Sequence, residues 1–155
     1  MKKSQAGFST IELIVVIVII GFVAITSAPY WQDVLDALTV NKAKGAAEQV
    51  QAAIEQTRAY AIMESADYRI RFPGNNKFQI DCVQSCSTSP PTEGPLPLVN
   101  NATVTPQGGV DPVCNGDWCI WFNSIGTSSG GDVQVRYGSE QRTVQVSFAG
   151  RVRIQ

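Results

Sequence analysis

Hydrophobic and polar residues are distributed unevenly along this chain of 155 residues. From Leu13 to Ile25 every residue is apolar or glycine, whereas the rest of the chain has the composition of a water-soluble domain. A helix without a polar face must be covered by lipid or by other protein surfaces. We therefore predict a hydrophobic helix over residues 8–28, followed by one domain over residues 29–155.

A second pattern follows Pro29, with apolar residues three or four positions apart. It predicts an amphipathic helix that ends near Glu64 and turns one face to a core. Counted from Phe8, a continuous helix would be about 85 Å long. Pro29 removes one backbone hydrogen bond and is expected to bend this helix; the alternative is that it ends a membrane span. The predicted core face contains Leu35, Leu38, Ala46, Val50, Ala53, Ile54, Thr57, Ala61 and Ile62.

Beyond the helix, the hydrophobic period changes to two, which is typical of half-exposed antiparallel strands. Residues 73–76 and 138–141 supply turns, and the stretch from Cys82 to Asp117 reads as a long connection. The predicted fold class is α+β: one long N-terminal helix, with its C-terminal half packed on a small antiparallel sheet. Inward-facing strand residues are Tyr68, Ile70, Phe72, Phe78, Ile80, Val133, Val135, Tyr137, Val144, Val146 and Phe148.

Four cysteines occur as Cys82-x3-Cys86 and Cys114-x4-Cys119. Zinc sites usually use tighter pairs, and thiols of a secreted domain become oxidised, so we predict two disulfides and no metal. Three pairings are possible; we favour the two local ones, because each closes a short polar loop. The chain contains no histidine, which is the commonest general base and metal ligand. We expect no enzyme activity and no cofactor.

Glu12 is an anomaly, because its carboxylate lies at the start of the apolar segment. An unpaired charge there would cost a few kcal/mol (about 2.5–3.5) on insertion into a membrane, so a partner is required. An ordinary signal peptide is the alternative reading, since Lys2 and Lys3 form a basic start and residues 26–28 could form a cleavage region. A signal peptide, however, gives Glu12 no role.

The segment from Gly7 to Ile20 resembles the type IV prepilin motif of type IV pilins and type II secretion pseudopilins. It combines a basic leader, Gly7-Phe8, a glutamate in the fifth position after the glycine, and a long apolar run. The resemblance implies that a prepilin peptidase removes residues 1–7 and N-methylates Phe8. It also implies that Glu12 meets the N-terminal amine of a neighbouring subunit during assembly. Pilins commonly have a helix-bending proline at the place of Pro29.

The same resemblance implies a route through the cell. The chain would cross the bacterial inner membrane once, with its head in the periplasm, before joining a pilus or pseudopilus. Its partners would be other pilin or pseudopilin subunits, the prepilin peptidase and the inner-membrane assembly platform. Removal of the leader leaves ten basic and thirteen acidic residues, a net charge of −3. This charge argues against bulk nucleic-acid binding.

Residues 52–72 and 144–153 resemble the GspH/FimT group of minor pilins and pseudopilins. A major pilin usually closes with a disulfide-bounded loop near its C-terminus, but here 36 residues follow Cys119. We therefore expect a minor subunit that assists assembly or tip function of a type IV pilus or a type II secretion pseudopilus. The third hypothesis, a membrane-tethered hydrolase, has no motif to support it, since the sequence lacks a Gly-x-Ser-x-Gly motif and paired carboxylates in helical register.

Gly150-Arg151-Val152-Arg153 resembles a Gly-Arg-x-Arg ending that is associated with DNA binding in the FimT branch. The alternative function is therefore a pilus-associated DNA receptor for natural transformation, with Arg151 and Arg153 as phosphate contacts. The competing interpretation is a last strand with Val152 and Ile154 inward and both arginines in solvent. Arg136 and Arg142 are candidates for extending a basic patch.

Two further groups of residues were considered as sites. Trp118, Trp121 and Phe122 could stack on bases or sugars, although such residues more often close a small core over a disulfide. Four aspartates resemble ligands of the calcium sites in some pseudopilins, but they lack a regular spacing of oxygen ligands. We therefore propose no metal for Asp81, Asp111, Asp117 and Asp132.

Overall fold

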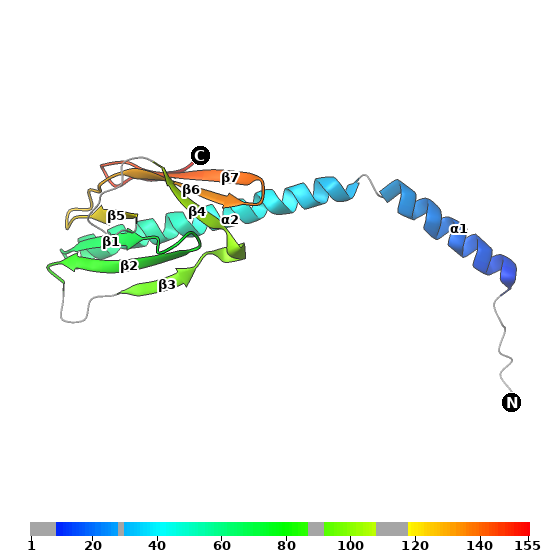
Figure 1. The fold of residues 1–155 in the computed structure, drawn as a ribbon, viewed down its shortest axis with the longest axis horizontal. Helices are drawn as coiled ribbons and strands as arrows, with labels where there is room; N and C mark the ends of the chain where they lie inside the picture. Colours follow the sequence, from blue (N-terminus) through cyan, green and yellow to red (C-terminus); the bar gives the residue numbers. More distant parts are fainter. Residues whose placement is uncertain (1–8, 28–29, 87–91, 108–117) are drawn as a thin grey trace, which may run out of the picture. The chain divides into compact units, whose positions relative to one another are not determined.

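The structure is a computed structural model, and it describes residues 9–27, 30–86, 92–107 and 118–155. Two helices come first, α1 over Thr10–Ser27 and α2 over Tyr30–Met63 (Figure 1). The chain divides into two units, 1–37 and 38–155, which we describe separately. Pro29 lies outside the described residues, so the bend that we predict there stays a prediction.

The second helix contributes one face to the core of the head. Its C-terminus at Met63 lies one residue from the predicted end. Leu35 and Leu38, which were predicted to face the core, are exposed, as is Ile62. The helix therefore begins to bury side chains only at Ala43, and its first three turns carry an uncovered apolar surface. The buried residues are Ala43, Ala46, Ala47, Val50, Ala53, Ile54, Thr57 and Ala61.

Eight described strands form two antiparallel four-stranded sheets rather than the single small sheet that we expected. The first sheet has the order β3-β2-β1-β5 and the second has the order β4-β6-β7-β8. The α+β class, with a long helix packed on antiparallel strands, is confirmed. The strands are β1 Asp67–Arg71, β2 Lys77–Gln84, β3 Glu93–Pro97, β4 Thr103–Gln107, β5 Cys119–Phe122, β6 Gly131–Tyr137, β7 Glu140–Val146 and β8 Val152–Ile154.

Strands β3 and β4 lie in the stretch that we expected to be a long connection. Both contain proline, and β3 also contains Gly94, and both residue types are uncommon inside strands, although β4 starts with the β-branched Thr103, Val104 and Thr105. Their conformation depends on partners: β3 pairs with β2, and β4 pairs with β6. Glu93, at the start of β3, is also held by α2, since its Oε1 accepts hydrogen bonds from Tyr60 Oη (2.7 Å) and Gln56 Nε2 (2.7 Å).

The core of the head lies between α2 and the two sheets. Tyr68 and Ile70 of β1, with Val133 and Val135 of β6, are fully buried, as their alternation with polar residues predicted. Phe148 departs from the prediction: β7 ends at Val146, and the Phe148 side chain is 77% exposed in the turn that follows. The turn between β6 and β7 contains only Gly138 and Ser139, in agreement with the predicted hairpin.

Candidate functional site

The N-terminal segment is the first candidate site. The backbone N–H groups of Glu12 and Leu13 donate to Ser9 O at 3.0 and 3.2 Å, so the helix starts just before Glu12. A carboxylate in the first turn is favoured by the helix dipole. Among the residues that the structure describes, no hydrogen bond or ion pair engages the Glu12 side chain. Gly7 and Phe8 lie outside the described residues.

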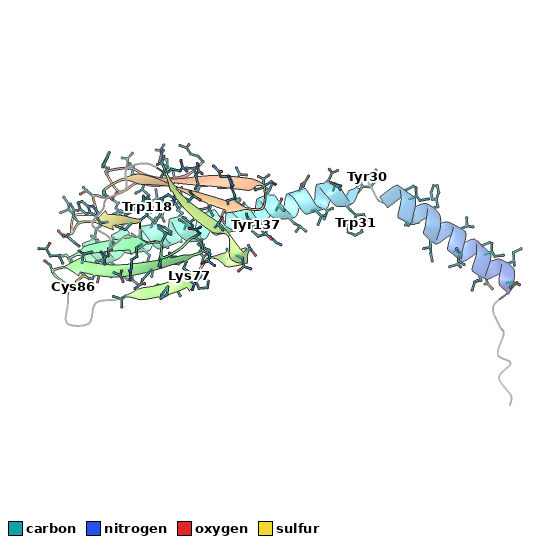
Figure 2. The ribbon with its side chains drawn as sticks, in the orientation of Figure 1. Tyr30, Trp31, Lys77, Cys86, Trp118 and Tyr137 are labelled. Carbon is teal, nitrogen blue, oxygen red and sulfur yellow. A yellow bond between two sulfur atoms is a disulfide. The ribbon has the colours of Figure 1, made fainter. Side chains whose placement is uncertain are left out.

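The surface of α1 is apolar on every side (Figure 2). All its large apolar side chains are exposed, with exposed fractions between 45% at Val16 and 76% at Ile25. Thr26, near its end, satisfies its hydroxyl within the helix by donating to Phe22 O at 3.0 Å. Within the described residues, no single helix meets the length and hydropathy of a membrane span; Thr10–Thr26 and Tyr30–Met63 meet them only when taken together.

The turn between β7 and β8 is the second candidate site, and it carries Arg151. Ser147 organises this turn: its N–H donates to Arg151 O at 2.9 Å, and its Oγ accepts from Arg151 N at 3.1 Å. Gly150 has φ +75°, a conformation that favours glycine, and an added Cβ would overlap Gly126 O. The glycine of the Gly-Arg-x-Arg segment therefore has a structural role.

Arg58 of α2 supports this turn through the loop that contains Gly126. Its Nε donates a hydrogen bond to Gly126 O at 3.0 Å, and Gly126 in turn packs against Gly150. Arg58 is absent from the core face that the helical period predicts, yet the structure places its side chain half-buried, with Nε bonded to the loop that contains Gly126. The sequence gives no local signal for this role, because the contacts join residues that are 68 positions apart.

Arg151 and Arg153 project from the exposed face of the second sheet, as the competing interpretation predicted, while Val152 and Ile154 pack against the core. Together with neighbouring side chains they line a pocket of about 290 Å³. Its walls are formed by Gln145, Ser147, Ala149, Arg151 and Arg153.

The register decides which other arginines share this face. Arg136 pairs with Gln141, which has the same orientation along β7 as Gln145, and its Nη2 donates to Gln141 Oε1 at 3.1 Å. Arg142 pairs with the buried Val135, so its side chain leaves the backbone on the opposite face of the sheet. Arg136 therefore extends the basic face, and Arg142 does not.

The aromatic candidates form part of the core rather than a platform. Trp118 is 6% exposed, its ring lies 5.5 Å from that of Phe72, and Phe122 is fully buried. Figure 2 places Trp118 within the head, and only Trp121, at 36%, reaches solvent. The hypothesis that all three rings form a stacking surface is therefore wrong.

The aspartates do not converge on a metal site in the described part of the chain, where no group of three potential ligands occurs. The Asp81 carboxylate forms ion pairs with two arginines, since its Oδ2 lies 2.7 Å from Arg71 Nε and 3.6 Å from Arg69 Nε. Asp132 accepts a long hydrogen bond of 3.4 Å from Gln145. Asp111 and Asp117 lie outside the described residues.

The disulfide Cys82–Cys86 is present, as predicted, and closes an exposed loop at the end of β2. Cys119 is also disulfide-bonded. Its predicted partner, Cys114, lies outside the described residues.

Comparison with known proteins identifies the architecture. The family model of the type II transport protein GspH matches residues 46–150, more than half of the chain. The chain belongs to the GspH family. The match runs from Ala46 in α2 through β7 and ends at Gly150, immediately before the two arginines, so β8 lies outside it.

Solved structures share the GspH-like fold at low sequence identity. The type IV minor pilin FimU of Pseudomonas aeruginosa superposes with a TM-score of 0.56 at 16% identity, covering 74% of this chain and 89% of FimU. The minor pseudopilin EpsH of the Vibrio cholerae type 2 secretion system gives 0.52 at 13%, covering 74% of this chain and 96% of EpsH. No curated protein matches the sequence significantly.

The GspH family and this fold together define the general role. The chain is a structural, non-enzymatic minor pilin or pseudopilin of a type IV pilus or a type II secretion system.

Proposed function

We propose that this GspH-family subunit starts at Phe8 after cleavage and that Glu12 pairs with the N-terminal amine of a neighbouring subunit in the filament. The observation that carries the proposal is the isolation of Glu12. Its carboxylate lies in the first turn of a helix with an apolar surface, and no described residue of its own chain pairs with it.

The position of Glu12 suits such a partner. Glu12 lies four positions after Phe8, which corresponds to about 6 Å along a helix, or roughly one turn. The amine and the carboxylate of two parallel subunits can therefore meet with only a small axial offset. In an apolar surrounding, a paired carboxylate avoids most of the cost of an isolated charge, so the pairing favours assembly over the dispersed subunit.

The route through the cell follows from the same surface. The apolar α1 is covered by the inner membrane before assembly and by other subunits afterwards, while the head stays in the periplasm. Its partners are the prepilin peptidase, the inner-membrane assembly platform and the other pilin or pseudopilin subunits. Both disulfides fit this oxidising compartment.

The experiment compares Glu12→Gln and Glu12→Ala with Thr10→Ala, a polar change two residues away. Each variant replaces the wild-type chain in the host, and sheared filaments are probed for the subunit. We expect at least tenfold less of both Glu12 variants in the filaments, at unchanged membrane levels, and wild-type amounts of Thr10→Ala. Wild-type incorporation of Glu12→Ala would overturn the pairing.

A second candidate function is DNA binding by the arginine pocket. Its support is the common face of Arg151, Arg153 and Arg136, whose three positive charges outnumber the Asp132 carboxylate on that face, although the mature chain carries −3. Three arginines neutralise few phosphates, so binding should be weak and should fall steeply with salt. Arg151→Gln/Arg153→Gln should reduce duplex binding at 50 mM salt and DNA uptake at least fivefold. Lys77→Gln, an exposed charge on the other sheet, should change neither; unchanged uptake in the arginine variant excludes the receptor.

A further inference from the structure

The outer strands of the two sheets differ in how their free edges are protected. β3 contains Pro95 and Pro97 and β4 contains Pro106, and proline has no N–H to offer another strand. The edge of β5 is covered, since Phe122 forms a bridge with Ser128 and Ser129 N donates to Trp121 O at 3.1 Å. Among the described outer strands, β8 alone has neither a proline nor a segment that pairs with its free edge.

The pairing of β8 with β7 shows which of its backbone groups are free. Gln155 and Thr143 exchange two hydrogen bonds, of 2.8 and 3.1 Å, and Ser147 N donates to Arg151 O. Because such pairs alternate along antiparallel strands, Arg153 bonds to Gln145, while the N–H and C=O of Val152 and Ile154 point away from β7. No other hydrogen bond to these four groups occurs in the described part of the chain.

The free edge of β8 is also ordered by contacts within the head. The side chains of Val152 and Ile154 pack against the core, and the preceding turn is fixed by Ser147 and by the contact of Gly150 with Gly126. A strand that pairs here therefore meets an ordered edge and loses conformational freedom only on its own side. In Figure 1 the chain terminus lies beside the sheet that contains β6 and β7.

We propose that β8 receives an extended strand with acidic side chains from another subunit of the filament, which extends the second sheet across the subunit boundary. The inference rests on the proposed incorporation of this chain into a filament. The charge of β8 indicates which strand would bind. The backbone groups of Arg153 bond to β7, so Arg153 and the residue opposite it on the added strand would form a non-hydrogen-bonded pair, in which cross-strand side chains are closest. Arg151 and Arg153 are both exposed there, so an acidic residue fits and a basic one does not.

The test removes one free N–H and leaves every hydrogen bond within the head intact. Val152→Pro does this at an edge position, and Val152→Ala is the matched control for the lost side chain. Both full-length variants are expressed in the host, and the subunit is quantified in membranes and in sheared filaments. We expect wild-type membrane levels of both variants and at least tenfold less Val152→Pro than Val152→Ala in the filaments.

Equal incorporation of Val152→Pro and Val152→Ala overturns the inference and leaves the proposed function intact. Absence of the wild-type chain from the filaments overturns both. If Val152→Pro does not fold, Arg153→Glu is compared with Arg136→Glu, which makes the same charge change away from the edge. We then expect a fivefold or larger loss of Arg153→Glu alone, and equal amounts of the two overturn the inference. Duplex binding separates this role from DNA binding: it should persist in Val152→Pro, and its loss there would contradict the free-edge assignment.

Discussion

The Arg58 guanidinium donates a hydrogen bond to the carbonyl oxygen of Gly126 at 3.0 Å and so joins the end of α2 to the loops of the head. Gly150 packs on the same carbonyl. The turn that presents Arg151 is therefore supported by the long helix, although the two lie far apart in the sequence. Whatever binds to the β7–β8 turn meets a surface whose position depends on this contact.

Arg58→Met keeps most of the apolar stem but removes the donor, leaving the Gly126 carbonyl without its partner. We expect the free energy of unfolding to fall by about 1–2 kcal/mol, the cost of an unsatisfied, partly buried acceptor. Denaturant unfolding of the full chain in detergent measures the change. Lys44→Met is the control, because the Lys44–Glu48 pair is 3.8 Å long and exposed, and its loss should have almost no effect. Equal stability of the two variants would contradict the role of Arg58.

Gly150→Ala tests whether the glycine before the arginines is structural. The substitution forces a side chain into a positive φ and against Gly126 O, so we expect a loss of about 2–4 kcal/mol. Gly74→Ala is matched in φ, at +78°, but its Cβ would have no neighbour within 4 Å, and it should cost only about 1 kcal/mol. Thermal unfolding of both variants gives the comparison, and an equal loss in the two would refute the packing argument.

Much of the head could be predicted because local patterns agree with the final packing. The strict alternation around Ile70 and Val135 defined β1 and β6, and the period of α2 identified most of its buried face. Leu35 and Leu38 follow the same period, yet both side chains are exposed in the described part of the chain. Periodicity shows that a face is apolar but not what covers it.

The missed features depend on contacts between distant segments. β3 and β4 are strands because β2 and β6 offer them hydrogen bonds, not because Gly94 or Pro106 favours a strand. The half-burial of Arg58 and the free edge of β8 likewise appear only when the loops and sheets are assembled. The N-terminal residues were the opposite case, since a short motif around Glu12 carried the functional prediction without any tertiary structure.

Alkaline pH provides a test of two tyrosines of the head, of which Tyr68 lies in the core and Tyr60 packs against it. The hydrogen bond to Glu93 raises the pKa of Tyr60, and burial raises the pKa of Tyr68, whose hydroxyl has no partner among the described residues. Both phenols therefore stay protonated in the folded state at a pH where the unfolded chain ionises. We expect the free energy of unfolding to stay level up to about pH 10, the ordinary tyrosine pKa, and to fall above it.

Unfolding curves between pH 8 and 11 measure this fall. Tyr60→Phe/Tyr68→Phe removes both titrating groups and should make the decline above pH 10 shallower than in the wild type. A decline of equal steepness in the double variant would mean that these two tyrosines do not determine the alkaline limit.

The most direct test of the central claim is the mass of the N-terminal peptide from the mature protein, isolated from its native host. The account predicts a peptide that begins with N-methylated Phe8 and contains Glu12. A mature chain that keeps Met1–Gly7, or one that begins after Ala28 as an ordinary signal peptide would leave it, would contradict the account.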